Sequence, residues 1–315
     1  MRVLMLSAGE VERLLDPDAL LDALAEEFQA LSAGSVVAPG RNEVSVGEPG
    51  FLLAMPVYRA GREITVKLVS VFHDNEAHGI PGHQALICLF DSQTGTPVCI
   101  MDGTHITAMR TAGAAALSTR LLAREDAPVL AIIGAGVQGA AHLRMLPRVR
   151  AFGEIRIASR HFEHAQQLAT ADPQARAVAT AEEAVRGADV VCLCTNSSDP
   201  VLRGERLSSG AHVTSIGYRP PGSELAAEVI ERGHLFVETR RAFEAPPVGC
   251  AELAGRDPAS GTEMGELLAN RRPGRNSAGE ITVYKAMGHA CEDMAAAALV
   301  YRRAQDQDVG NLVTL

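Results

Sequence analysis

The sequence feature that most constrains the fold is a glycine-rich turn that directly follows an apolar segment. Residues 129–133 are apolar, as is typical of a buried parallel strand, and they lead into Gly134-Ala-Gly-Val-Gln-Gly139. A helix-like apolar spacing follows over 140–146. In such a turn the first glycine permits the tight bend, the second lets backbone approach a pyrophosphate, and the third lets the helix pack close to the strand. The pattern therefore predicts dinucleotide binding at a helix N-terminus; the alternative is an ordinary Gly-rich turn.

Strand-like and helix-like segments alternate after this turn. Helices are expected over 162–169 and 181–186, and strands over 129–133, 154–158, 177–180, 190–194, 212–216 and 235–238. This alternation predicts an α/β fold with a right-handed, doubly wound parallel sheet. Six strands match a complete Rossmann-type domain. The least regular stretch, 244–275, is expected to surround the cofactor or the cleft.

The N-terminal region predicts a second domain of the α+β type. A capping box at Ser7 and the pair Asp16-Pro17 each predict the start of a helix. Antiparallel strands follow, joined at the end by a hairpin turn over 91–95, and a helix over 106–124 leads into the dinucleotide domain. The strands are expected over 50–56, 64–72, 84–90 and 97–101.

Composition excludes several classes of partner. The chain has 315 residues and a formal net charge of −9 without basic clusters, which argues against nucleic acid and anionic membranes. No apolar run is long enough to span a bilayer, and the N-terminus lacks the pattern of a signal peptide. The six cysteines lack metal-binding spacing and are typical of a reducing compartment. We therefore expect a cytoplasmic protein.

The end of the second expected strand bears on the choice of cofactor. An NAD site usually places an acid there to accept from the ribose 2′-hydroxyl, whereas an NADP site supplies a cation. The residues are Ala158-Ser-Arg-His161, with no acid among them. Ser159 and Arg160 are suited to a 2′-phosphate. This favours NADP(H), with NAD(H) still possible and a solvated arginine as the alternative.

Two cations stand in unusual surroundings. Lys67 lies in the middle of an apolar strand pattern, where it is costly unless it pairs with an anion or lines a polar cavity. Partial desolvation would lower its pKa and suit it to acid–base work; alternatively, it is an edge-strand lysine whose head reaches water. Arg110 lies among small residues on a helix. It is suited to binding a carboxylate, or it forms a structural ion pair.

A group of polar residues between two strands raises the question of a metal site. It comprises His73, Asp74, Glu76, His78 and His83. Their spacing fits neither a helical nor a zinc-finger ligand pattern, so we expect no metal.

Several blocks of the sequence resemble the ornithine cyclodeaminase/μ-crystallin family, and they cover almost the whole chain in order. The blocks are Lys67-Leu-Val-Ser-Val-Phe-His-Asp-Asn75, Leu89-Phe-Asp-Ser-Gln-Thr-Gly95, Thr107-Ala-Met-Arg-Thr-Ala112, Gly134-Ala-Gly-Val-Gln-Gly139 and Ile281-Thr-Val-Tyr-Lys-Ala-Met-Gly288. The resemblance implies a homodimer. It also implies a substrate-binding and dimerisation domain of residues 1–119 with 290–315, and a dinucleotide-binding domain of residues 120–289.

The resemblance also implies site residues. Arg41, Lys67 and Arg110 match the basic residues that hold the substrate carboxylate, and Met55 would face the cleft. The positions that match cofactor contacts are Thr111, Gly134, Gly136, Val137, Gln138, Gly139, Ser159, Arg160, Thr195 and Gly217.

Two departures from the cyclodeaminase pattern separate the possible reactions. The acids that those enzymes carry correspond to Leu53 and Arg219 here, which removes the obvious bases for deprotonating an amine. Arg219 would instead bind a second anionic group of the substrate or pair with a neighbouring acid. This favours NAD(P)H-dependent reduction of a C=N bond in a small, carboxylate-bearing imino acid, or the reverse oxidative deamination. A lyase that uses NAD without net redox change and a noncatalytic NADPH binder remain as alternatives.

The expected mechanism is hydride transfer to a carbon held by its carboxylate. Arg110 and Arg41 would clamp the carboxylate near the nicotinamide, so that positioning supplies much of the acceleration. Lys67 is the candidate proton donor or electrostatic orienter, and His83 is a second, weaker candidate.

Overall fold

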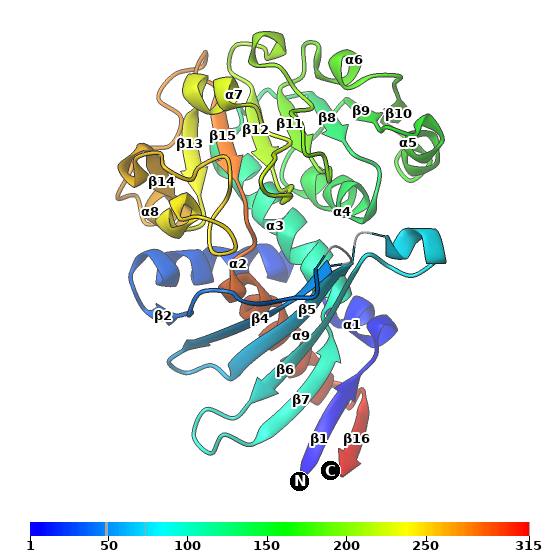
Figure 1. The fold of residues 1–315 in the computed structure, drawn as a ribbon, viewed down its shortest axis with the longest axis vertical. Coiled ribbons are helices and arrows are strands. Elements are labelled where there is room, and N and C mark those ends of the chain that lie inside the picture. Colours follow the sequence, from blue (N-terminus) through cyan, green and yellow to red (C-terminus); the bar gives the residue numbers. More distant parts are fainter. Residues whose placement is uncertain (48–49, 73, 315) are drawn as a thin grey trace. The chain divides into compact units, whose positions relative to one another are not determined.

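The chain divides into two compact units (Figure 1). The computed structural model describes residues 1–47, 50–72 and 74–314. The first unit comprises Met1–Arg110 and His289–Leu315, and the second comprises Thr111–Gly288. The division at 110/111 thus falls inside the helix that was expected to lead into the dinucleotide domain.

The first unit is built on a mixed sheet with strand order β16-β1-β7-β6-β5-β4-β2, in which β3 pairs with β4. Strands β4 to β7 form the antiparallel meander that the sequence predicted, and the hairpin turn at Asp91 is confirmed by its bonds to Gln93 and Thr94. The strands are β1 (Arg2–Leu6), β2 (Val36–Val37), β3 (Asn42–Ser45), β4 (Gly50–Arg59), β5 (Ile64–Phe72), β6 (His83–Phe90), β7 (Pro97–Asp102) and β16 (Asn311–Thr314).

The two chain ends add an unexpected pair of strands to this sheet. Strand β1 runs parallel to β7, and β16 pairs antiparallel with β1, so that Arg2 lies opposite Thr314. All four residues of β16 are exposed. No apolar alternation therefore marked it, and its place depends on backbone pairing with a segment from the other end of the chain.

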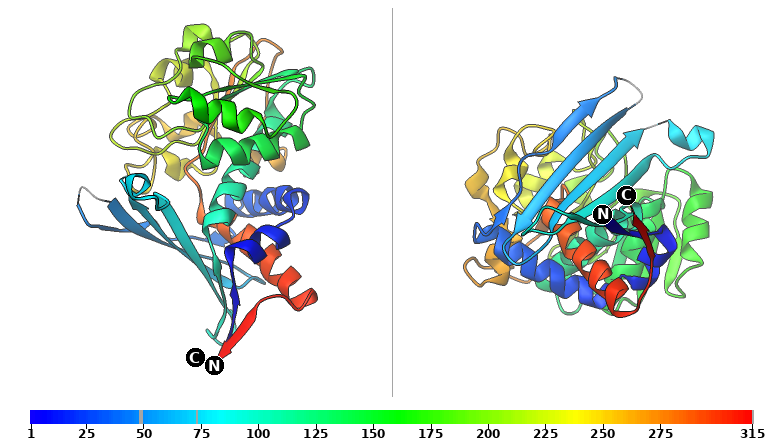
Figure 2. Two further views of the ribbon diagram at one scale, coloured as in Figure 1. Left: turned by 90° about the vertical axis from the view of Figure 1, so that its right-hand side faces the viewer. Right: turned by 90° about the horizontal axis from the view of Figure 1, so that it is seen from below.

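Helices cover one face of this sheet. The predicted caps are confirmed, since Ser7 bonds with the Glu10 carboxylate and Asp16 accepts from the backbone of Ala19. Figure 2 shows α1, α2 and α9 on the same side of β4–β7, with the opposite face free of helices over the described residues. The helices are α1 (Ala8–Leu14), α2 (Pro17–Ser32), α9 (Ala290–Asp306) and the first part of α3 (Thr104–Leu122).

The second unit is a doubly wound sheet in which every strand pair is parallel, which confirms the predicted α/β class. The strand order is β10-β9-β8-β11-β12-β15-β13-β14. The strands are β8 (Val129–Ile133), β9 (Glu154–Ala158), β10 (Ala175–Ala177), β11 (Val190–Leu193), β12 (His212–Ser215), β13 (His234–Val237), β14 (Gly261–Glu263) and β15 (Thr282–Lys285). The helices are α4 (Val137–Met145), α5 (Phe162–Ala169), α6 (Ala181–Val185), α7 (Ala227–Arg232) and α8 (Met264–Leu268).

The predicted number of six strands is wrong, because the described sheet holds eight. Strand β15 inserts between β12 and β13, and it was missed because Thr282 and Lys285 interrupt its apolar pattern. Both side chains are nevertheless fully buried. They are tolerated because Thr282 bonds with Arg275 and Lys285 pairs with Glu252. Strand β14 and helix α8 lie in 244–275, which is more regular than expected.

No helix among the described residues combines the length and the apolar character that crossing a membrane requires.

Candidate active site

The three glycines of the turn between β8 and α4 each meet a different steric requirement. Gly134 has a φ of +112°, and a Cβ there would lie 2.3 Å from the carbonyl oxygen of Cys194. A Cβ on Gly139 would lie 2.1 Å from the Gly134 carbonyl, so this glycine allows the close approach of α4 to the strand. Gly136 has open space around its Cα. The turn thus fits a pyridine dinucleotide, whose pyrophosphate needs such access to backbone N–H groups.

The carboxyl ends of the central strands of the second unit lie together at this turn. The N–H of Gly134 donates to the carbonyl of Ala158, at the end of β9, and Gly134 also contacts Cys194 at the end of β11. Strands β9 and β11 flank β8 on opposite sides, so the strand order reverses direction here. In doubly wound sheets this is where nucleotides bind.

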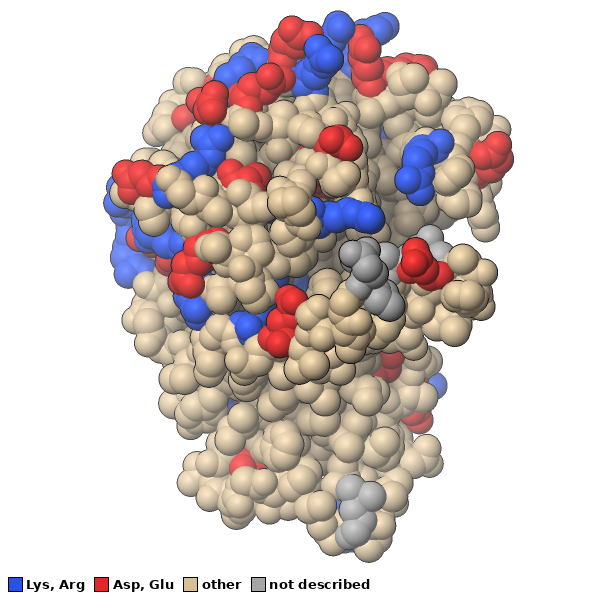
Figure 3. Space-filling view, in the orientation of Figure 1, with Lys and Arg blue, Asp and Glu red and all other residues tan. Residues whose placement is uncertain are grey.

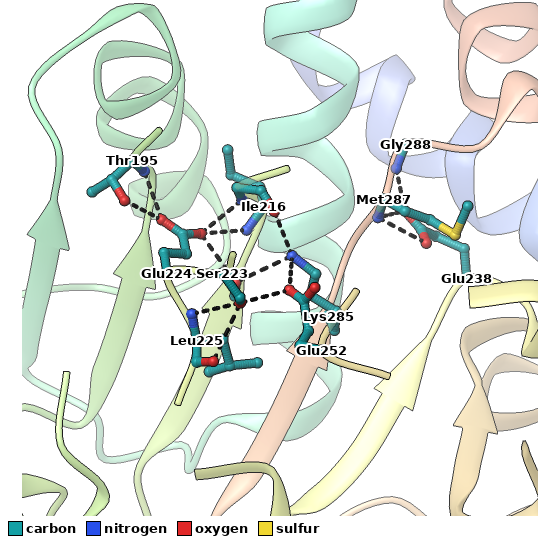
Figure 4. A network of polar contacts seen from close by, with 12 residues as sticks. Thr195, Ile216, Ser223, Glu224, Leu225, Glu238, Glu252, Lys285, Met287 and Gly288 are labelled. Atoms are coloured by element: carbon teal, nitrogen blue, oxygen red, sulfur yellow. Dashed lines mark hydrogen bonds and ion pairs between the residues drawn. The ribbon is translucent and has the colours of Figure 1, made fainter. Parts of the chain in front are cut away.

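A buried carboxylate connects the ends of β11 and β12. Glu224 is 1% exposed and accepts hydrogen bonds from Thr195 and from Gly217, two residues that the resemblance assigned to cofactor contacts. Figure 4 shows this carboxylate between the two loops, with Lys285 and Glu252 beside it. The structure therefore brings Thr195 and Gly217 together, through a residue that the sequence had not marked.

Ser159 and Arg160 follow the end of β9. Ser159 is partly buried, whereas Arg160 is exposed and makes no ion pair with any described residue. No carboxylate follows β9 before α5 begins at Phe162. The second unit thus presents a cation where an NAD site usually presents an acid.

Lys67 of the first unit is buried in the middle of the sheet. It lies on β5, between β4 and β6, with Met55 and Ile87 as its register partners, and is 1% exposed. Its Nζ lies 2.9 Å from Oδ1 and 2.8 Å from Oδ2 of Asp293, in the first turn of α9. The alternative of an edge-strand lysine whose head reaches water is therefore wrong, and the prediction that Lys67 pairs with an anion is confirmed.

Burial and the nearby charge of Arg110 lower the pKa of Lys67 from 10.5 to about 8, although Asp293 opposes the shift. Burial alone would raise the pKa of Asp293, but Arg110 and Lys67 outweigh it and the pKa is lowered. At pH 7 the pair is therefore an ammonium and a carboxylate, with the ammonium within reach of deprotonation.

Arg110 joins the same group from helix α3. Its Nε donates to Oδ1 of Asp293 over 3.0 Å and its Nη1 donates to Oε2 of Glu292 over 3.1 Å. Both acids are almost fully buried. The structural ion pair expected as one alternative is thus present. Binding of a substrate carboxylate by Arg110 stays a prediction.

The other predicted residues of the first unit lie near this group. Arg41 precedes β3 and its charge further lowers the pKa of Lys67. Met55 is buried beside Lys67 on β4. His83 begins β6 with solvent-exposed surface, and partial loss of hydration and the charges of Lys67 and Arg110 lower its pKa to about 4. Its imidazole is therefore neutral at pH 7, which makes it a poor proton donor there.

Asp293 and Glu292 were missed by sequence reasoning. A signal was available, because they are the two acids in the first turn of a helix whose following residues are Met294 and a run of alanines. Acids on a helix that is otherwise buried must pair with cations. Glu224 carried no comparable signal, because it lies in a loop of mixed composition.

The two positions that depart from the cyclodeaminase pattern lie in different units. Leu53 is buried on β4. Arg219 is exposed after β12, and its Nη1 donates to the carbonyl of Asn196 over 3.5 Å. Among the described residues no acid forms an ion pair with Arg219, and both alternatives for this arginine stay predictions.

The polar residues considered as a metal site, from His73 to His83, are only partly described by the structure. His73 lies outside the described residues, and Asn75–His78 form a short 3₁₀ helix. Over the part of the chain that the structure describes, no three His, Cys, Asp or Glu residues are grouped as metal ligands.

Comparison with known proteins identifies relatives along almost the whole chain. Residues 1–308 match the model of the ornithine cyclodeaminase/mu-crystallin family, which confirms the resemblance. The ketimine reductase mu-crystallin of Mus musculus is 36% identical over 304 residues, 94% of this chain and 96% of that protein.

Two solved structures are similar over their full lengths. The Δ1-pyrroline-2-carboxylate reductase of Thermococcus litoralis, in complex with NADH and L-proline, has a TM-score of 0.93 and 30% identity, covering 99% of this chain and 100% of that one. An archaeal alanine dehydrogenase dimer with bound NAD has a TM-score of 0.88 and 29% identity, and both chains are covered completely.

Proposed function

The chain belongs to the ornithine cyclodeaminase/mu-crystallin family, and from that premise we propose that it reduces the C=N bond of a small imino acid with NAD(P)H. The reverse reaction is the oxidative deamination of an amino acid. An NAD(P)-dependent oxidoreductase acting on C=N bonds is the class that the ketimine reductase and pyrroline-2-carboxylate reductase relatives support. The substrate would carry a carboxylate and be cyclic or open-chain.

One observation carries the proposal: two buried cations, Lys67 and Arg110, share the carboxylate of Asp293. Fully buried lysine and arginine side chains are rare unless they are paired, and here both pair with the same carboxylate. Because Leu53 and Arg219 replace both acids of the cyclodeaminases, the chain lacks the obvious bases of the lyase reaction.

The roles of the residues follow from their chemistry. Arg110 and Arg41 would bind the substrate carboxylate, Met55 would line the substrate site, and Arg219 would hold a second anionic group where the substrate has one. Lys67, as an ammonium of lowered pKa, would hold or give the proton of the iminium nitrogen. The cofactor would be held by the glycine turn with Val137 and Gln138, and by Thr111, Ser159, Arg160, Thr195 and Gly217. When bound, the reduced pyridine nucleotide supplies the hydride.

A direct assay tests this function. Purified protein is mixed with NADPH or NADH and a panel of cyclic and open-chain ketimine acids, and cofactor absorbance is followed. Consumption of the cofactor is the expected result. Ammonia release from ornithine without a change in NAD(P)H would identify a lyase, and cofactor binding without turnover across the panel would identify a binder.

We propose that NADP(H) is preferred over NAD(H), because Arg160 follows β9 where an acid would favour NAD. Charge-assisted bonds to a phosphate contribute about 1.5–3 kcal/mol, so Arg160→Ala should lower the preference for NADPH, measured as a ratio of kcat/KM values, by about 10-fold to 100-fold. The matched control is Arg176→Ala, an exposed arginine of β10. An unchanged ratio in Arg160→Ala would contradict the preference.

The helix-free face of the first unit supports a homodimer. Val44, Leu52, Leu68 and Leu86 lie on it and are between 37% and 61% exposed. Figure 3 shows few charged side chains over the part of the molecule that holds these strands, so a second copy can approach without like-charge repulsion. The similar alanine dehydrogenase is itself a dimer.

Leu86→Lys tests this interface, because each interface would contain two added cations. We expect the variant to sediment as a monomer where the wild type sediments as a dimer. The control, Leu312→Lys on β16, adds the same charge at an exposed leucine of the sheet edge. A dimer that persists in Leu86→Lys would remove this face from the interface.

We also propose that the first unit binds the substrate and mediates dimerisation, with the second unit binding the dinucleotide. All six cysteines are free, which supports a cytoplasmic location because cytoplasmic thiols stay reduced.

A further inference from the structure

Glu224 is a buried acceptor for five hydrogen bonds, which come from the last residue of β12 and from the loops that follow β11 and β12. Its Oε1 accepts from Ser215 Oγ at 3.0 Å and from the N–H groups of Ile216 and Gly217 at 3.1 and 2.7 Å. Its Oε2 accepts from the N–H and the hydroxyl of Thr195, both at 2.7 Å. A carboxylate accepts at both oxygens, whereas an amide would place its NH₂ against some of these donors.

The groups that donate to Glu224 lie at the carboxyl ends of β11 and β12. These ends adjoin the edge where β8 meets the glycine turn. The spacing between the two loops is tight, since a Cβ on Gly217 would lie 2.6 Å from the Glu224 carboxyl carbon and 2.6 Å from the Thr195 carbonyl. The carboxylate thus bridges the two loops at close range.

A second buried group fixes the same loop from its other side. The Nζ of Lys285, at the end of β15, donates to the Gly217 carbonyl over 2.6 Å and lies 2.7 Å from Oε1 of Glu252. Ser223 Oγ donates to the same Glu252 oxygen. Burial alone would lower the pKa of Lys285, but the nearby acidic groups, Glu252 foremost, together outweigh burial and the pKa is raised. Gly217 is therefore held at both its N–H and its carbonyl.

We infer that Glu224, supported by Lys285, is a positioning residue that holds the loops after β11 and β12 in the arrangement that receives the nicotinamide half of the cofactor. The inference rests on the proposed function. The adenosine half would be bound elsewhere, by the glycine turn and by Ser159 and Arg160. Loss of the Glu224 carboxylate should therefore weaken binding of the whole dinucleotide and leave binding of its adenosine half unchanged.

The test compares two ligands by calorimetry. NADPH spans both halves of the site, and 2′,5′-ADP occupies the adenosine half alone. For Glu224→Gln we expect NADPH affinity to fall about 10-fold or more, because buried donors lose their acceptor. We expect 2′,5′-ADP affinity to stay within about twofold of the wild type.

Asp189→Asn is the matched control. Asp189 is also a buried carboxylate that accepts from a backbone N–H, that of Val129, but it lies at the amino end of the sheet. The Asp189→Asn variant should keep the wild-type affinity for both NADPH and 2′,5′-ADP. If Glu224→Gln does not fold, the double variant Lys285→Met with Glu252→Gln removes the second support without leaving an unpaired charge, and it should show the same selective loss.

Three results would overturn the inference. Equal loss of both ligands would mean that Glu224 supports the unit as a whole, and unchanged NADPH affinity would mean that the loops hold their places without it. Wild-type protein that binds neither these two ligands nor NADH would contradict the proposed function itself, and this inference with it; where only NADH binds, NADH and AMP take the place of the two ligands.

Discussion

Replacing Asp293 by alanine is expected to lower the free energy of unfolding by about 3–5 kcal/mol, because one partner of a buried ion pair is removed. Asp293 contacts both Lys67 and Arg110, and among the described residues it is the one anion paired with Lys67. Arg110 keeps Glu292 in the variant, whereas Lys67 is left as a buried charge without an anion. Urea unfolding at pH 7 measures the effect.

Two further variants separate an unpaired charge from a simple loss of packing. Asp306→Ala changes an exposed acid at the end of the same helix and should alter stability by no more than about 0.5 kcal/mol. Adding Lys67→Met to Asp293→Ala removes the stranded cation and should restore part of the lost stability. If the double variant is less stable than Asp293→Ala alone, the charge at Lys67 is not the cause.

The same pair of residues shows what a single sequence can and cannot predict about this site. Lys67 was marked from its own strand, because a lysine within an apolar alternation demands an anion or a polar cavity. Its partner lies 226 residues later, on another element. The local pattern shows that Lys67 needs an anion. The packing of α9 against β4 and β5 brings that anion to it, and a contact between segments so far apart in the sequence cannot be predicted from local pattern.

The same distinction applies to the strands and helices: some could be predicted from the sequence and others could not. The glycine turn and the alternation after it predicted the parallel sheet, because each strand and helix carries its own periodicity. Strand β15 was missed since its polar residues are compensated by distant groups, among them Glu252. Strand β16 was missed since it lies at an exposed edge and is held by pairing with β1. Elements that depend on a partner far along the chain are the ones that local pattern leaves out.

Replacing Lys67 by methionine is expected to lower kcat/KM for imine reduction by about 10²- to 10⁴-fold, the range typical for loss of a general acid. Methionine keeps much of the buried stem, and Asp293 keeps Arg110 as its partner. Stability should therefore fall less than in Asp293→Ala. Steady-state kinetics with a ketimine acid that the wild type reduces measures the change.

Lys67→Arg distinguishes proton donation from a purely electrostatic role. Arginine keeps the positive charge but does not release a proton in this pH range. If Lys67 gives the proton, the variant should be as impaired as Lys67→Met. If Lys67 only orients the substrate by its charge, Lys67→Arg should retain much of the wild-type rate.

The pH profile gives an independent check on the same role. A donor must be protonated, and the pKa of Lys67 is lowered to about 8, so the wild-type rate of reduction should fall as pH rises through about 8. Asp293 raises the pKa of Lys67, so Asp293→Asn should move this fall to lower pH. A wild-type rate that stays constant to pH 10, or a fall in Asp293→Asn at the wild-type pH, would mean that the ammonium of Lys67 does not donate the proton.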